Sequence, residues 1–261
     1  MPANYAHYRL GFQSIPALPE SAVRAIRKAR RMFDVGLHGP DFFFYADIVG
    51  KSELGALGSG YHHRSVRELF QNAARDLRLK PSDEGTAYLY GVLGHFCLDT
   101  ICHPRIRELH CTGAVTHTEL ETEFDRYLLC LDGKKHPSAV DTGKHIRVNA
   151  AQAARIASVY PPVTGPQVER CIRRMRLLSS FFADSGRVKH AAIALVRRAA
   201  SPRVAELAMQ DQPNPRAQPY NEMLLSLYNQ AMELYPRLAK QLSDHLHHNA
   251  PLGPEFDRTF G

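Results

Sequence analysis

The chain has 261 residues, 44% of them hydrophobic, and a formal net charge of +7. This length buries a sizeable core without disulfides, and the composition is that of an ordinary globular protein, which excludes a low-complexity chain. The excess of positive charge favours anionic partners such as phospholipid surfaces, nucleic acid or phosphate esters, without choosing among them.

Cysteine usage and the N-terminal segment indicate the compartment and the kind of core. The five cysteines cannot all pair within one chain and form no CxxC motif, so we expect reduced core thiols and no thiolate zinc site. Residues 1–16 contain no basic region followed by an apolar stretch, and we therefore expect a cytoplasmic protein without a signal peptide. The longest apolar run, 86–102, includes His95 and Asp99, which argues against a transmembrane segment.

Helical patterns dominate the first part of the chain. Apolar residues at three- and four-residue spacing predict a helix over 22–33, followed by a glycine- and proline-containing loop over 36–40. The aromatic run 41–45 comes next. Three glycines within 55–60 predict a second flexible segment before a helix over 64–79.

The same patterning continues to the C-terminus. Ser82 is expected to cap a long helix, and Pro104 to bend or end it. Further helices are predicted over 116–130, 147–159, 165–184, 187–210 and 220–245, with breaks over 132–144 and 212–219. No alternating pattern typical of a strand is present. The sequence predicts an all-α protein with a single domain over residues 1–261.

The most informative segment is the helix expected over 85–103, which is apolar nearly all round and so should be buried. His95, Asp99 and His103 recur every four residues and therefore lie along one stripe of it. An ionised aspartate without a partner in such a core costs several kcal/mol. The next helix presents His117 and Glu121, again four apart. Two such sets on consecutive helices favour a site for divalent metal ions over satisfied core hydrogen bonds.

Several segments in a fixed order resemble a known family over residues 1–130. The segments are Tyr-Ala-His7-Tyr-Arg-Leu-Gly, Gly39-Pro-Asp41-Phe-Phe-Phe-Tyr, His62-His-Arg…Glu-Leu-Phe70, Gly94-His95-x3-Asp99-x3-His103-Pro and His117-x3-Glu121. Together they resemble the zinc-dependent phospholipase C family, which shares an all-helical trinuclear-zinc fold with the S1/P1-type nucleases.

The resemblance implies ligands for two to three zinc ions. The first zinc would be held by Asp41, His62, His95 and Asp99. The second would be held by His103, His117 and Glu121. The third would use His7, a bridging Asp99 and the N-terminal amine and carbonyl. Asp41 is the implied general base and Phe42 an implied substrate contact. This chain departs from the secreted members in having no tryptophan.

Other histidines fit the pattern less well. His63 neighbours His62, but the spacing to Phe70 selects His62 as the ligand. His38, three residues before Asp41, is interpreted as a loop residue more readily than as a contact of the ligands. The tract 244–248 is interpreted as a solvated helix end.

The leading functional hypothesis is hydrolysis of a phosphodiester, with phospholipase C-type cleavage of phospholipids by a zinc-generated hydroxide. A peripheral membrane surface is a possible partner. The first alternative is an S1/P1-like nuclease acting on single-stranded nucleic acid, which the basic charge also suits. The second is a zinc-stabilised helical protein with little turnover.

Overall fold

The computed structural model describes residues 4–46, 52–183 and 206–261. Within these ranges the chain forms helices and no strands, which confirms the predicted all-α class. The α-helices are α1 (Asn4–Ser14), α2 (Glu20–Lys28), α3 (Arg30–Gly36), α4 (Glu53–His62), α5 (Arg67–Leu79), α6 (Asp83–Cys111), α7 (His117–Leu131), α8 (Ala150–Ala157), α9 (Gly165–Phe182) and α12 (Asn221–His248). The 3-10 helices are η1 (Ile15–Ala17), η2 (Gly39–Tyr45), η3 (Pro137–Ala139), η4 (Gln218–Tyr220) and η5 (Pro254–Asp257).

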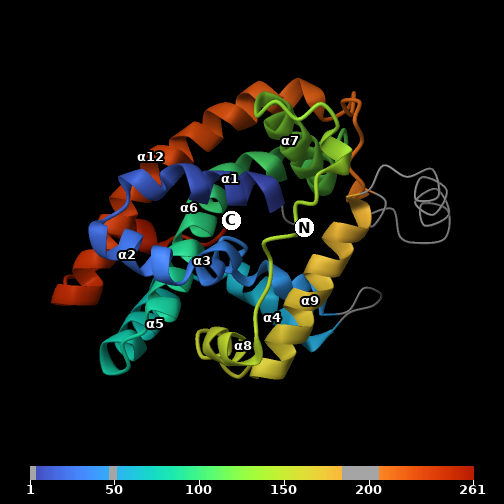
Figure 1. Ribbon diagram of the computed structural model, residues 1–261. Coiled ribbons are helices and arrows are strands. Elements are labelled where there is room, and N and C mark those ends of the chain that lie inside the picture. Colours follow the sequence, from blue (N-terminus) through green and yellow to red (C-terminus); the bar gives the residue numbers. More distant parts are fainter. Residues whose placement is uncertain (1–3, 47–51, 184–205) are drawn as a thin grey trace.

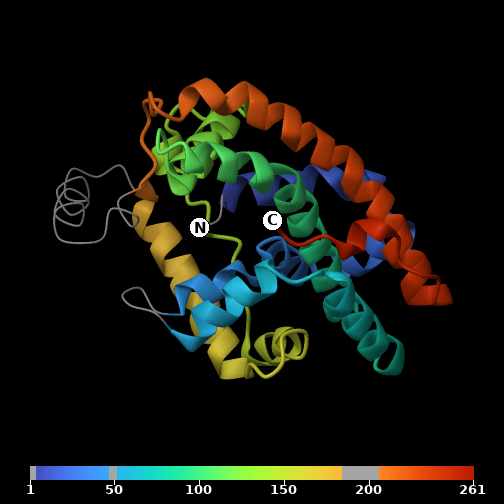
Figure 2. The ribbon, with the colours of Figure 1, turned by 180° about the vertical axis from the view of Figure 1, so that it is seen from behind.

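Helix α6 is the centre of the molecule. It begins at the predicted cap, where the Ser82 hydroxyl accepts the backbone N–H of Gly85 at 3.2 Å. Residues 87–99 are all buried, because α1, α2, α3, α5, α7, α8 and α12 pack around this helix. Helices α12 and α9 lie on opposite sides of it (Figures 1 and 2). The polar stripe of α6 is therefore held inside the protein.

Two predictions in the first part of the chain are wrong. The helix expected over 22–33 is two helices, because the backbone breaks at Ala29 (φ −131°, ψ 44°) so that α3 can cross α6. The glycine-rich segment 55–60 is part of helix α4. Ser52 caps this helix, and its hydroxyl accepts the N–H of Gly55 at 3.0 Å. A Cβ on Gly58 would lie 2.7 Å from Cβ of Phe43, so this glycine provides close packing against η2 rather than flexibility.

The helix does not end at Pro104, because α6 continues for seven more residues to Cys111. Proline removes one backbone hydrogen bond within a helix. Ile106 and Leu109, both buried, offset this loss by packing the last turns against the core.

The later helices follow the predicted order. Helices α7, α8, α9 and α12 lie within about three residues of their predicted bounds. The helix predicted over 187–210 falls largely on residues outside the described ranges. One hydrophobic cluster contains residues from Ala6 to Phe260, and the single-domain assignment stays a prediction. All five cysteines are free thiols, and the expectation of core positions is right for Cys97, Cys102 and Cys171 but wrong for the exposed Cys111 and Cys130.

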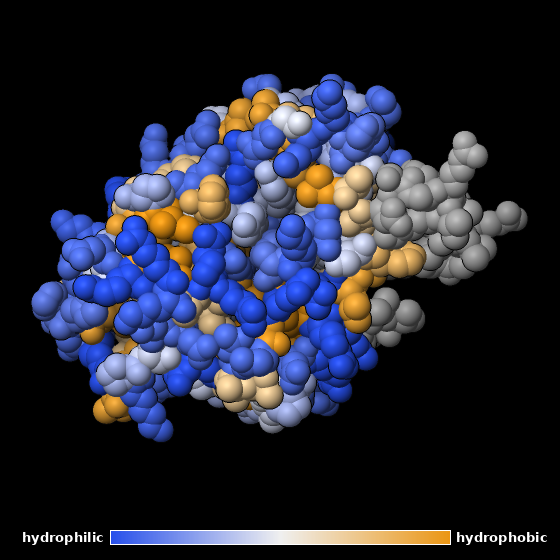
Figure 3. Space-filling view, in the orientation of Figure 1, coloured by the Kyte–Doolittle hydropathy of each residue, from blue (hydrophilic) through white to orange (hydrophobic). Residues whose placement is uncertain are grey.

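A helix that spans a membrane must be both long and predominantly apolar. None of the helices in the described residues is both long and apolar enough to cross a bilayer. On the face shown in Figure 3, hydrophilic side chains predominate and hydrophobic ones form small separate patches.

Candidate metal centre

The stripe on α6 forms the middle of the site. His95 and Asp99 are 0% and 2% exposed, and Nε2 of His95 lies 3.1 Å from Oδ2 of Asp99. One turn further along, Nε2 of His103 lies 3.6 Å from Oδ1 of the same carboxylate. Four-residue spacing brings these three side chains to one face, as the sequence predicts.

A first group of candidate ligands forms where η2 and α4 meet this stripe. It consists of Asp41, His62, His95 and Asp99, all buried, with one ligand atom of each lying within 4.8 Å of the others. Gly39 allows the approach of η2, because its φ of +46° is left-handed and a Cβ there would lie 2.2 Å from the His95 ring. Nε2 of His62 is 2.8 Å from Oδ1 of Asp41, and Nδ1 of His62 donates to the carbonyl of Gly58 at 2.8 Å.

A second group, again with ligand atoms within 4.8 Å of one another, contains His103, His117 and Glu121. A capping box at Thr116 and Glu119 starts α7 at the turn that carries His117. Nε2 of His117 lies 3.0 Å from Oε1 of Glu121, and Nε2 of His103 lies 3.5 Å from the same oxygen. The His117 side chain is 28% exposed, more than that of any other of the eight predicted ligands.

His7 belongs to neither group but reaches the carboxylate that stands between them. Its Nε2 lies 3.2 Å from Oδ1 of Asp99, and its ring centroid is 4.4 Å from that of His95. The structure thus brings all eight predicted ligands into one region. The N-terminal amine and carbonyl implied for a third zinc lie outside the described residues.

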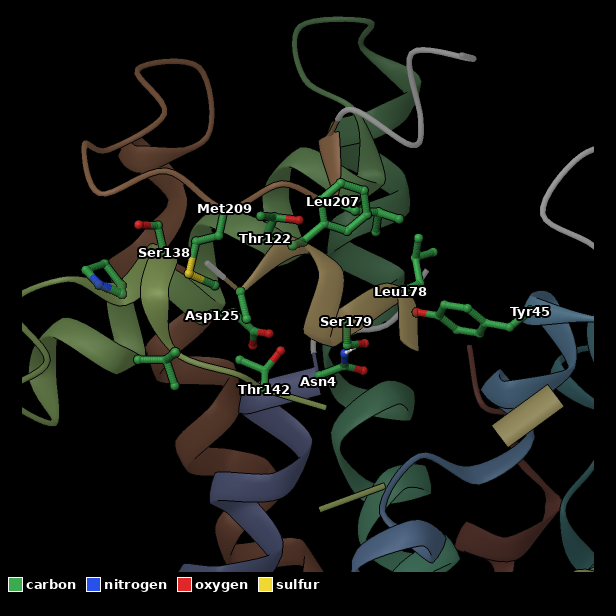
Figure 4. Close-up of a pocket in the computed structure, with 14 residues that line it drawn as sticks. Asn4, Tyr45, Thr122, Asp125, Ser138, Thr142, Leu178, Ser179, Leu207 and Met209 are labelled. Carbon is green, nitrogen blue, oxygen red and sulfur yellow. Dashed lines mark hydrogen bonds between the residues drawn. The ribbon is translucent and has the colours of Figure 1, made fainter. Parts of the chain in front are cut away.

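The position of His7 depends on Asp125, whose role the sequence reasoning did not identify. Its carboxylate accepts the backbone N–H groups of Tyr5 and Ala6 at 2.9 and 2.7 Å, which joins α7 to the first turn of α1. Burial raises the pKa of Asp125 to about 7, although these two bonds lower it. Figure 4 shows Asp125 and Asn4 at a cavity of about 50 Å³ that polar and apolar side chains line in about equal measure. That volume holds a few waters and no phospholipid head group.

The donor set fits a divalent cation. Nε2 of the fully buried His95 makes no hydrogen bond among the described residues, although two carboxylates face it at 3.1 and 3.9 Å. Ligands of one tetrahedral zinc lie about 3.4 Å apart, which falls within this range. Burial raises the pKa of Asp99, but the three histidines around it outweigh this and hold the pKa well below its usual value. A buried anion faced by an imidazole nitrogen that makes no hydrogen bond is a favourable set of ligands for a cation.

Metal uptake is expected to depend on pH through His103. Burial lowers its pKa, but Asp99 and Glu121 outweigh burial and raise it to about 9. The metal-free protein therefore holds a proton there at pH 7, and zinc must displace it. We expect zinc affinity to rise about tenfold per pH unit, for one proton, up to about pH 9.

Competition with a chelator of known affinity between pH 6.5 and 9.5 measures this dependence, and calorimetry in two buffers counts the protons released. The raised pKa of His103 has the opposite effect on the stability of the metal-free protein, which falls as pH rises. Because the folded pKa is raised, its contribution to stability is complete below the unfolded value of about 6.5 and is lost as pH rises through about 9. An affinity that does not change above pH 7 would contradict the assignment.

The structure also places the remaining candidates. His63 is exposed, whereas His62 is buried beside Asp41. His38 is fully buried, and its Nε2 lies 2.7 Å from Nε2 of His145. Its side chain therefore packs inside the protein and is paired with His145. Burial lowers the pKa of His38 well below its usual value, and this pair is neutral.

The Phe42 side chain is buried, whereas a substrate contact would be accessible. Its ring is 1% exposed and packs 4.3 Å from Phe43 and 5.8 Å from Tyr160, measured between ring centroids. The 3-10 turn of η2 directs Asp41 toward α6 and the Phe42 ring into the core. Phe42 therefore supports the loop that carries Asp41.

Comparison with known protein families identifies the family of this chain. The family model for zinc-dependent phospholipase C matches residues 6–174, a range that contains all eight candidate ligands. Neither the curated proteins nor the solved structures give a match. Because the family match covers well over half of the chain, the protein belongs to the zinc-dependent phospholipase C family.

Proposed function

We propose that this hydrolase cleaves a phospholipid between glycerol and phosphate at the centre formed by the eight candidate ligands, with two to three zinc ions bound. Phospholipase C-type function follows from the family, and the chain is a zinc-dependent enzyme. The observation that carries the assignment of the site is Asp99, a buried carboxylate with His7 and His103 at one oxygen and His95 at the other.

The residues of the first group suit the activation of water. Bound zinc lowers the pKa of water to about 7 and neutralises charge on phosphate oxygens. Burial raises the pKa of Asp41, but His95 and His62 outweigh it and keep the carboxylate ionised at neutral pH. Asp41 can therefore accept a proton from the attacking water and hold its oxygen toward phosphorus. The diacylglycerol oxygen then leaves with a proton from solvent.

The substrate is expected to approach from the side of His117. The His117 side chain is 28% exposed, whereas the side chains of His95 and Asp99 are 0% and 3% exposed. The net charge of +7 favours an anionic phosphodiester.

Zinc analysis together with a substrate panel tests the proposal. Purified protein is expected to contain two to three zincs per chain and to release diacylglycerol from short-chain phosphatidylcholine or another phospholipid. Bis-nitrophenyl phosphate reports general phosphodiesterase activity, and single-stranded DNA reports nuclease activity. Hydrolysis of DNA without hydrolysis of any phospholipid would replace the proposal by the nuclease alternative. Fewer than two zincs, with no turnover, would favour a zinc-stabilised protein.

A further inference from the structure

The C-terminal segment 249–261 returns from α12 to the middle of the molecule. Its end lies beside α6 in both views, close to the centre of the fold (Figures 1 and 2). Leu252, Phe256 and Phe260 are 5%, 0% and 1% exposed and recur every fourth residue. This segment lies beyond residues 6–174, so the family match does not account for it.

The segment is held in place by the start of α5. The guanidinium of Arg67 donates to the carbonyls of Leu252 and Gly253 at 3.0 and 2.8 Å and pairs with Asp257. The backbone N–H of Val66 donates to the carbonyl of Arg258 at 3.0 Å. These bonds fix the path of the chain directly before Phe260.

Phe260 contacts three of the candidate ligands. Its ring centroid lies 5.5 Å from that of His62 and 5.3 Å from that of His95. Its carbonyl accepts the Nδ1–H of His103 at 3.1 Å. Gly261 lets the end of the chain pack closely against His103, because a Cβ there would lie only 2.4 Å from Cβ of His103.

We propose that Phe260 is a positioning residue of the metal centre. Its carbonyl keeps the proton of neutral His103 on Nδ1 and leaves Nε2 for the metal, and its ring limits the rotation of His62 and His95. Partners of this kind around metal-bound histidines fix the tautomer and the orientation of the ring. This inference rests on the ligand assignment proposed above.

Phe260→Ala tests the inference against a matched control, Phe256→Ala. Phe256 belongs to the same segment and is equally buried, but its ring contacts among the described residues are Phe70 and Phe96 rather than a candidate ligand. We expect Phe260→Ala to lower the zinc affinity of the folded protein about 10- to 100-fold. Phe256→Ala should destabilise the fold and leave this affinity within about twofold of wild type. The absorption bands of the cobalt-substituted protein should shift only for Phe260→Ala.

A second variant covers the case in which Phe260→Ala does not fold. Phe260→Leu keeps an apolar side chain and most of the core volume, so it disturbs the packing less than alanine does. It removes the flat ring beside His62 and His95, so zinc affinity should fall about 3- to 10-fold. Wild-type affinity in Phe260→Leu, or equal losses in Phe260→Ala and Phe256→Ala, would overturn the inference. Wild-type protein that binds fewer than two zincs would instead overturn the proposed function.

Discussion

Replacement of Asp99 by alanine is expected to remove zinc and phospholipase activity together. The carboxylate is 2% exposed and stands between the two groups of candidate ligands, so its loss removes a shared ligand. Metal catalysis contributes several kcal/mol of transition-state stabilisation, which corresponds to a fall in kcat/KM of about 10³-fold or more. Atomic absorption on dialysed protein and turnover of a short-chain phospholipid measure the two effects.

Asp34→Ala provides the control for the loss of a buried aspartate. Asp34 is 8% exposed and pairs with Arg30 at 2.6 Å rather than with a candidate ligand. We expect this variant to be less stable but to retain its zinc. Full zinc content and full turnover in Asp99→Ala would refute the assignment of the centre.

A second large effect is expected from Gly91→Ala, at the crossing of α3 and α6. A Cβ on Gly91 would lie 2.4 Å from the carbonyl oxygen of Phe33, and a Cβ on Gly36 would lie 2.3 Å from that of Tyr88. Both contacts are with backbone, which cannot move aside as a side chain can. We expect the free energy of unfolding to fall by about 3 kcal/mol or more, at the upper end of the usual cost of overpacking.

The same substitution should weaken zinc binding, because α3 leads directly into η2. Displacement of α3 would move Gly39 from the His95 ring and carry Asp41 with it. Urea denaturation with and without zinc measures both effects. Gly60→Ala is the control, since nothing lies within 4 Å of its Cβ position in α4. There, alanine should raise stability by about 0.5–1 kcal/mol. Equal unfolding midpoints for the two variants would contradict the close crossing.

Local spacing made part of the centre predictable. His95, Asp99 and His103 share a face because four residues make about one helical turn, and His117 and Glu121 do so for the same reason. The predicted cap at Ser82 is also local, because its hydroxyl accepts the backbone N–H three residues ahead, and Thr116 caps α7 in the same way. The all-α class followed from the same periodicity.

Other features required knowledge of which surfaces pack together. Pro104 and the glycines of 55–60 are helix breakers by local propensity, but burial of Ile106 and close packing of Gly58 override it. The spacing of Leu252, Phe256 and Phe260 was a signal of a buried segment, but spacing alone does not say against what the segment packs.

By itself, the sequence predicted the helical class, two sets of candidate ligands within single helices and, by resemblance, the family and its eight candidate ligands. Only the tertiary structure decided how His7, Asp41 and His62 approach Asp99, and that Phe260 lies against them. The physical reason is the separation of the residues along the chain. Contacts within one helix are set by the geometry of that helix. Contacts between α1, η2, α4 and the C-terminal segment depend on how their buried faces fit around α6.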